Sequence, residues 1–238
     1  MNVKPRVILT KNMELDRIMG GVPIPSVTLI EGENDTGKSL LAYHLAIGAL
    51  SMGLTARYIT TETTVKGLVA QMSELCDDVI HHFIMGRFSV TAVHTEKIRW
   101  DERVAKYYLA AILNFVKSPR GAADFTVIDS ITYVAAHAEE KDILSFFSEL
   151  MRYTYSSANV AIITIHPFAF SEELLVRIRS ACDGHILLHK KILRGSEIVR
   201  TLEVAKMKGA PLPAEKVVFF KVRPRFGIKV IPVSQVRA

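Results

Sequence analysis

Cysteine is scarce in this sequence: Cys76 and Cys182 are the two among 238 residues. They lack the close spacing of metal-binding or redox motifs, which excludes a disulfide-rich secreted fold and fits a reducing cytosol. His81 and His82 lie near Cys76, but no second ligand pair accompanies them. We therefore expect no metal site built from these residues.

Long hydrophobic runs are also missing. No stretch approaches the roughly 18 consecutive apolar residues that a membrane-spanning helix requires. Residues 1–11 hold no extended apolar core, so we expect no signal peptide. Low-complexity tracts are absent while 49% of the residues are hydrophobic, which indicates a folded globular chain. The length fits one α/β domain covering residues 1–238.

No block of like charge forms a binding tail, although the net charge is +6. Such an excess permits a nucleic-acid partner without requiring one, and its even spread is typical of a solvated surface. Trp100 and the pair Tyr107–Tyr108 are more typical of a core or an interface than of base stacking. We therefore expect no nucleic-acid partner.

The sequence does contain a phosphate-binding loop. Residues 26–39 are S-V-T-L-I-E-G-E-N-D-T-G-K-S, an apolar strand leading into G-x-x-x-x-G-K-S, and an apolar helix follows. This order is the context that the P-loop motif requires. Its glycines let backbone N–H groups converge on phosphate oxygens, Lys38 adds a cation that we expect to face solvent, and Ser39 is a Mg²⁺ ligand. We predict ATP and Mg²⁺ as cofactors, bound by Gly32, Glu33, Asn34, Asp35, Thr36, Gly37, Lys38, Ser39 and Leu40.

Hydrophobic periodicity predicts alternating strands and helices after the loop. Strands are expected near 56–62, 87–93, 125–130 and 160–165, and helices near 65–75, 101–117, 141–157 and 171–182. In the helix at 101–117 the expected cap is Asp101, and the expected buried stripe is Val104, Tyr108, Ile112 and Phe115. Short strands near 185–191, 197–206, 216–222 and 227–232 predict antiparallel hairpins. The fold class is α/β, a mainly parallel sheet with helices on both faces and an antiparallel C-terminal edge.

Three polar side chains follow strands at the edge of the sheet where α/β folds bind ligands. Asp129, after the apolar run 125–128, is interpreted as the carboxylate that holds Mg²⁺ through water. The alternative is a loop aspartate that caps the next segment. Glu62 is a candidate catalytic base for water, or a strand end with local hydrogen bonds only. His166 is a candidate γ-phosphate sensor, or a local hydrogen-bonding residue.

Two further stretches resemble the KaiC-like ATPases of the RecA superfamily. Residues 13–23, M-E-L-D-R-I-M-G-G-V-P, are similar to the Gly-Gly-x-Pro turn before the first core strand of that family. Residues 204–209, V-A-K-M-K-G, are similar to its Lys-Met-Arg-Gly segment, which reaches a neighbouring subunit's γ-phosphate. The resemblance covers residues 8–235 and implies a RecA-like P-loop NTPase core. It also implies a homo-oligomer, a hexameric ring, with Lys206 and Lys208 acting in trans.

Within that superfamily the chain is most similar to the FlaH (ArlH) group of archaellum accessory ATP-binding proteins. The resemblance implies a cytoplasmic, ATP-gated regulator of the archaeal flagellum, held at the membrane by the motor ATPase and a membrane platform protein. Two departures from the KaiC pattern are expected to weaken hydrolysis more than binding. Thr63 replaces a second glutamate, and Lys208 replaces an arginine whose planar fork lysine lacks. We expect a slow Mg-dependent ATPase at most.

Two other functions remain open from the sequence. The net charge favours a DNA recombination mediator of the RecA/RadA type. Against it, residues 130–141 are apolar and then acidic, unlike a DNA-gripping loop, and no helix-hairpin-helix-like module is present. Ser130, Thr132 and the threonines within 60–64 supply hydroxyls for a KaiC-like autokinase, but nothing singles one out.

Overall fold

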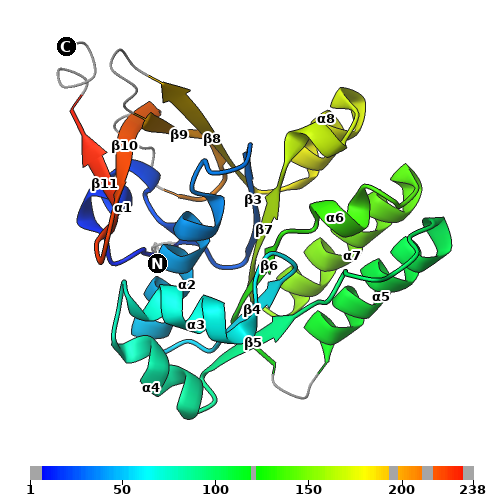
Figure 1. Ribbon diagram of the computed structural model, residues 1–238, viewed down its shortest axis with the longest axis horizontal. Coiled ribbons are helices and arrows are strands. Elements are labelled where there is room, and N and C mark those ends of the chain that lie inside the picture. The colour runs from blue at the N-terminus through cyan, green and yellow to red at the C-terminus, as the bar shows by residue number, and fades with distance from the viewer. Residues whose placement is uncertain (1–6, 119–121, 193–197, 211–216, 233–238) are drawn as a thin grey trace, which may run out of the picture.

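A mixed sheet organises the chain in the computed structural model, which describes residues 7–118, 122–192, 198–210 and 217–232. Its nine strands follow the order β11-β10-β9-β8-β3-β7-β6-β4-β5 (Figure 1). The parallel strands are β3 (Ser26–Gly32), β4 (Ala56–Thr60), β5 (Phe88–Ala92), β6 (Phe125–Asp129), β7 (Val160–Ile165) and β8 (Gly184–Ile192). The predicted parallel core is confirmed.

The antiparallel edge is confirmed as well. It consists of β9 (Ile198–Met207), β10 (Val217–Arg223) and β11 (Gly227–Ile231). A separate two-stranded sheet pairs β1 (Val7–Ile8) with β2 (Val22–Pro23). The C-terminal third therefore widens the sheet beyond β8 instead of forming a second layer.

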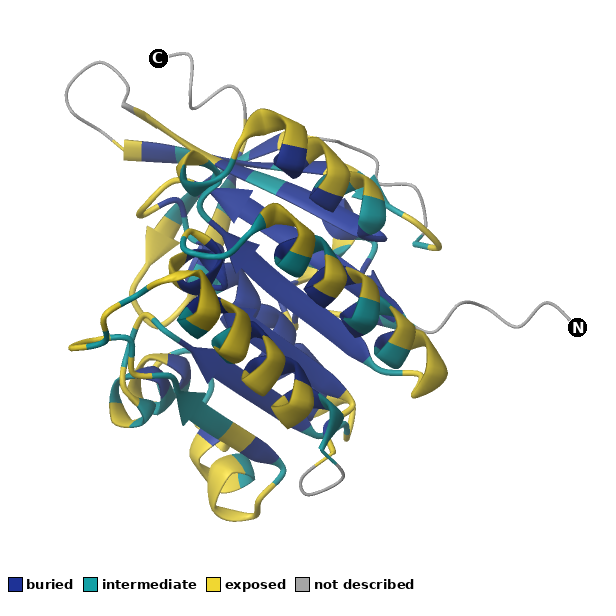
Figure 2. Cartoon of the chain, turned by 90° about the vertical axis from the view of Figure 1, so that its right-hand side faces the viewer, coloured by how far each residue is buried: buried dark blue, intermediate teal, exposed yellow. Residues whose placement is uncertain are grey.

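Helices cover the two faces of the sheet in two groups. One face carries α1 (Met13–Met19), α2 (Lys38–Ser51), α3 (Val65–Ser73) and α4 (Asp78–Ile84). The other carries α5 (Glu102–Lys117), α6 (Thr132–Ala135), α7 (Glu140–Ser156) and α8 (Glu172–Ala181), whose buried residues face the strands in Figure 2. Every residue of β3 and β7 is buried, as expected for apolar runs sandwiched between helix layers. Within the described residues, no helix combines the length and apolar character needed to span a bilayer.

The buried stripe of α5 differs from the prediction. Asp101 does cap the helix, since its Oδ1 accepts from Val104 N at 2.8 Å. Ile112 of the predicted stripe is buried, but the other buried residues are Ala105, Leu109, Leu113 and Val116. Phe115 is 38% exposed, and the Arg57 guanidinium lies 4.4 Å from its ring centroid. The ring therefore pairs with a cation at the rim of the core instead of filling the core.

The outer edge of β11 is closed by side chains from the helix side. Ile228 N donates to His44 Nε2 at 3.2 Å, and Ile228 O accepts from Asn12 Nδ2 at 2.6 Å. Val230 N donates to Glu14 Oε2 at 3.0 Å. Burial lowers the pKa of His44 to about 4, so its ring stays neutral and can accept this bond at neutral pH.

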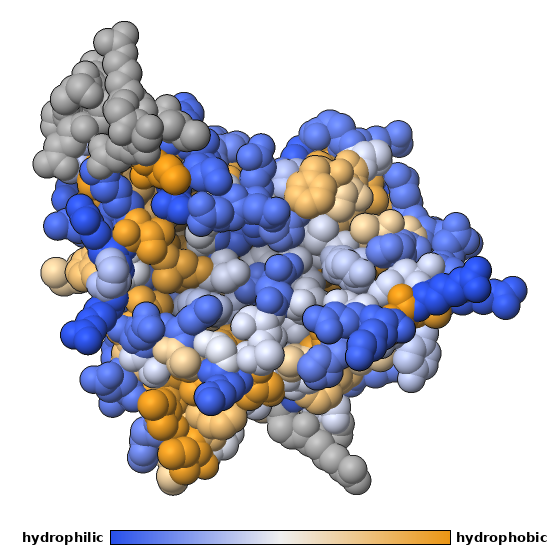
Figure 3. All heavy atoms as spheres, in the orientation of Figure 1, coloured by the Kyte–Doolittle hydropathy of each residue, from blue (hydrophilic) through white to orange (hydrophobic). Residues whose placement is uncertain are grey.

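Exposed apolar side chains gather on α4, at the lower edge of the face shown in Figure 3. They are Ile80, Phe83 and Ile84, followed by Met85. None of these residues lines the pockets beside the P-loop. The apolar surface of α4 is therefore separate from the candidate site.

Candidate functional site

The P-loop joins β3 to α2 in a conformation that only small residues allow. A Cβ on Gly32 would lie 2.6 Å from Leu188 O and from Thr36 Oγ1, and Gly37 has a left-handed φ of +98°. No described side chain caps the N-terminus of α2, so its first N–H groups are available to a phosphate. This local geometry fits a bound nucleotide.

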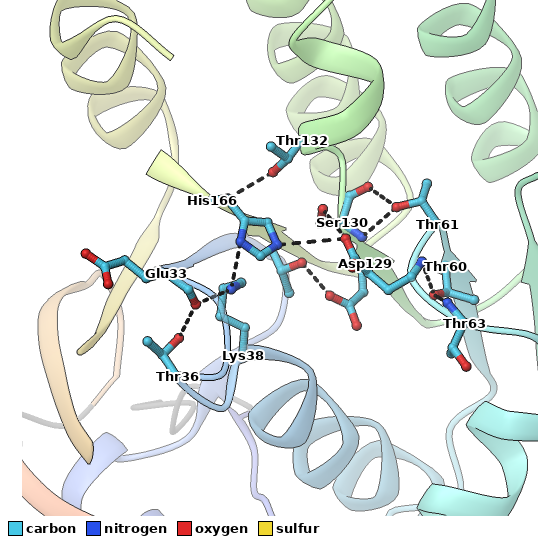
Figure 4. Close-up of polar contacts among 12 residues, drawn as sticks. Glu33, Thr36, Lys38, Thr60, Thr61, Thr63, Asp129, Ser130, Thr132 and His166 are labelled. Carbon is cyan, nitrogen blue, oxygen red and sulfur yellow. Dashed lines mark hydrogen bonds and ion pairs between the residues drawn. The ribbon is translucent and has the colours of Figure 1, made fainter. Parts of the chain in front are cut away.

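Lys38 is buried, which corrects the expectation that it faces solvent. The residue is 5% exposed, and burial lowers the pKa of its ammonium. Its Nζ donates to Glu33 O at 2.7 Å and lies 3.3 Å from His166 Nδ1 (Figure 4). Thr36 Oγ1 donates to the same carbonyl at 2.8 Å. The Glu33 carbonyl thus accepts hydrogen bonds from two other residues of the loop, and Lys38 lies beside His166, the candidate γ-phosphate sensor.

His166 connects Lys38 to Glu62. A lysine ammonium has only donors, so Nδ1 of His166 must be the accepting nitrogen, and the proton of a neutral ring lies on Nε2. That nitrogen is 3.8 Å from Glu62 Oε1, which also accepts from Ser130 Oγ at 3.0 Å. The nearby His166 ring lowers the pKa of Glu62, and the Ser130 hydrogen bond and the charge of Lys38 lower it further. One carboxylate oxygen of Glu62, Oε1, therefore already has contacts with Ser130 and His166.

Asp129 lies at the end of β6 and is 2% exposed. Its Oδ1 accepts from Thr164 Oγ1 and its Oδ2 from Tyr58 OH, both at 2.6 Å. Burial raises the pKa of Tyr58 well above its usual value, so the phenol remains a donor. The two hydrogen bonds fix the orientation of the Asp129 carboxylate, and each oxygen keeps a lone pair for a metal-bound water.

The two predicted metal residues line the same space. Ser39 and Asp129 border a pocket of about 420 Å³, together with Asn34, Asp35, Gly37, Lys38, Leu40, Glu62 and His166. A neighbouring pocket of about 570 Å³ shares Ser39, Leu40 and Asp129 and extends towards the hairpin of β10 and β11. The described residues hold no cluster of three or more metal-ligating side chains. A hydroxyl and a carboxylate fit Mg²⁺, which takes few protein ligands beside phosphate and water.

Lys206 and Lys208 are not brought to this site. β9 is antiparallel to β8, so its start faces the P-loop and its end lies at the opposite edge of the sheet. Lys206 lies six positions along the chain from Arg200, which contacts the P-loop, and this is a span of about 20 Å. Lys206 Nζ also donates to Arg179 O and Ser180 O, both at 3.1 Å, and to Cys182 O at the end of α8. The trans contacts of Lys206 and Lys208 stay predictions. Within its own chain, the Lys206 ammonium already has hydrogen-bond partners.

Tyr58 and Thr164 are the site residues that the sequence patterns did not reveal. Thr164 is the one hydroxyl in the apolar run 160–165, which is a detectable signal. Tyr58 lies on β4, and its contact with Asp129 depends on strand order that the sequence does not state. Both orient the candidate metal carboxylate.

Comparison with known proteins identifies the family. The KaiC ATPase family matches residues 9–235. The chain belongs to the KaiC family of ATPases. A protein of Sulfolobus acidocaldarius described as archaeal flagellar ATP-binding protein FlaH is 36% identical over 232 residues, covering 98% of this chain and 100% of that protein. The protein of the same description from Methanocaldococcus jannaschii is 25% identical and covers 94% of each chain.

Solved structures agree with this KaiC-family assignment. The crystal structure of flagellar accessory protein FlaH from Methanocaldococcus jannaschii has a TM-score of 0.78 at 25% identity, over 92% of this chain and 96% of that one. A KaiC-like protein from Pyrococcus horikoshii has a TM-score of 0.73 at 22% identity, over 96% and 100%. The KaiC/RecA-like fold expected from the sequence is therefore confirmed.

Proposed function

We propose that this chain is an ATP-binding regulator of an archaeal flagellum motor, in which nucleotide binding switches assembly. The observation that carries the proposal is the contact chain from Lys38 through His166 to Glu62 beside a P-loop. The FlaH relatives, described as archaeal flagellar ATP-binding proteins, support the biological setting.

Bound Mg·ATP would supply a third phosphate whose charge ADP lacks. Gly37 and the N-terminus of α2 bind phosphate, Lys38 neutralises its charge, and Ser39 and Asp129 hold the metal. His166 precedes the short helix η1 (Pro167–Ala169), which carries the 73% exposed Phe168. If His166 changes its partner, the adjoining helix η1 and its exposed Phe168 can therefore shift at the surface.

Slow hydrolysis follows from the state of Glu62. A general base works best when its pKa lies near the working pH, whereas the neighbours of Glu62 lower its pKa. Its carboxylate is held by Ser130, and Thr63 supplies no second carboxylate. We propose that binding, rather than turnover, is the main signal.

Assembly would place subunits head to tail in a ring. Lys208 is exposed at the sheet edge opposite the P-loop, so it can reach only the nucleotide of another copy. The ring would act in the cytoplasm and join the membrane through the motor ATPase and a platform protein. Light scattering of the wild type with Mg·ATP, with Mg·ADP and without nucleotide tests the switch, and a pull-down with the motor ATPase tests the partner. Equal mass in all three states would refute the proposed assembly switch.

The autokinase alternative keeps one observation in its favour. Ser130 Oγ donates to Glu62 Oε1 within the site, so a hydroxyl and a carboxylate are already paired there. Mass spectrometry after incubation with Mg·ATP tests it, and phosphate on Ser130 would establish it. The only observation that favours the DNA-binding alternative is the net charge of +6.

A further inference from the structure

Asp35 has a left-handed backbone within the P-loop. Its φ is +62°, in the left-handed region that glycine adopts freely and other residues enter at a cost. The side chain is 63% exposed, so burial does not hold this conformation. Contacts from outside the loop reach Asp35 from β9 and β8.

Arg200 makes these contacts from β9. Its Nε donates to Asp35 O at 2.8 Å, and its terminal NH2 nitrogen donates to Asp35 Oδ1 at 3.0 Å. Lys190, the cross-strand partner of Arg200 on β8, places Nζ 3.5 Å from Asp35 Oδ2. The Arg200 side chain is 12% exposed, which limits its freedom to point elsewhere. One guanidinium thus grips both the backbone and the carboxylate of one loop residue.

The same part of the sheet supports the other left-handed residue of the loop. A Cβ on Gly37 would lie 3.4 Å from two ring atoms of Phe220 and 4.0 Å from Arg200 Cδ. Phe220 and Arg200 are cross-strand partners on β10 and β9. The P-loop therefore rests on the antiparallel edge of the sheet, with Arg200 as its polar contact.

We propose that Arg200 is a positioning residue of the nucleotide site, which acts through Asp35 to hold the backbone of the P-loop in its phosphate-binding shape. The proposal rests on the nucleotide site of the proposed function. Its physical basis is that two donors in one planar fork fix the backbone carbonyl and one carboxylate oxygen of Asp35 together, which a single ammonium cannot do. Lys190 contributes charge to the cluster.

Losing this contact should weaken ATP and ADP equally, because the loop backbone cradles the phosphates that both nucleotides share. Removing a charge-assisted pair of hydrogen bonds corresponds to a loss of about tenfold in affinity. Arg200→Gln and Arg200→Lys should both show most of this loss of affinity. Lys191→Gln is the matched control, because Lys191 is exposed on the opposite side of β8 from Lys190.

A glycine at position 35 separates an action through Asp35 from a direct contact with the nucleotide. Glycine adopts φ +62° without help, so Arg200→Gln should cost less than threefold in an Asp35→Gly background. Calorimetry with Mg·ATP and Mg·ADP measures the affinities of the wild type, both single variants and the double variant. Thermal midpoints confirm that each variant is folded.

Three outcomes would overturn the positioning role. They are wild-type affinity in Arg200→Lys, an unchanged cost of Arg200→Gln when residue 35 is glycine, and a loss confined to ATP. Failure of the proposed function looks different, because the wild type itself would then bind no nucleotide or show no change in mass with ATP.

Discussion

Replacing Lys206 and Lys208 one at a time with methionine separates a helix cap from a contact between subunits. Methionine keeps an aliphatic stem and removes the ammonium. Lys206 donates to Arg179 O, Ser180 O and Cys182 O at the C-terminus of α8, where a cation also interacts favourably with the helix dipole. We expect Lys206→Met to cost about 1.5 kcal/mol of unfolding free energy. For a chain of this length, that lowers the thermal midpoint by roughly 3–6 °C.

Lys208→Met should leave the thermal midpoint unchanged, because Lys208 is exposed. It should abolish the increase in mass that we propose Mg·ATP produces, whereas Lys206→Met should keep that increase. Calorimetric melting and light scattering of both variants, each with ATP and ADP, provide the readouts. The reasoning is refuted if Lys206→Met melts like the wild type but no longer assembles, or if Lys208→Met assembles normally with ATP.

Lys38→Ala should abolish nucleotide binding in calorimetry and also lower the thermal midpoint, because the buried ammonium braces Glu33; wild-type affinity would reject the phosphate site. Asp129→Asn should retain part of the ATP affinity and lose most of its Mg²⁺ dependence, and a wild-type metal response in parallel titrations would reject the metal role. His44 has its pKa lowered by burial from 6.5 to about 4, so the unfolded chain binds the proton more readily than the folded one. Its stabilising effect is complete above pH 6.5 and falls by about 3 kcal/mol as the pH drops to 4; urea unfolding across this range tests it, and His44→Gln should flatten the slope.

Much of the fold was predictable because parallel strands covered on both faces require continuous apolar runs. The run 160–165 is an example, and β7 occupies it fully buried. The predicted α5 stripe is confirmed at Ile112 and wrong at Phe115, which pairs with Arg57 at the rim of the core. Periodicity finds a helix more reliably than it finds which neighbouring residue faces inward.

The candidate site was predictable where the motif is local in sequence and not where it depends on strand order. The P-loop spans consecutive residues, so its members could be named directly. Tyr58 and Asp129 are 71 residues apart, and Arg200 and Asp35 are 165 apart. Only the order β9-β8-β3-β7-β6-β4 brings such pairs together. The burial of Lys38 was missed for the same reason, since His166 covers it from another strand.

The closed edge of β11 bears on how copies of this chain avoid aggregation. An unpaired strand edge is a template for β-pairing with another chain, and many proteins blunt it with charge or proline. Here Asn12 and His44 occupy both backbone groups of Ile228, and Glu14 occupies the N–H of Val230. A second sheet therefore cannot extend this one at β11 while these side chains remain in place. Protonation of His44 in acid would replace its acceptor with a donor facing Ile228 N–H, which would remove one of the three side-chain hydrogen bonds that close this edge.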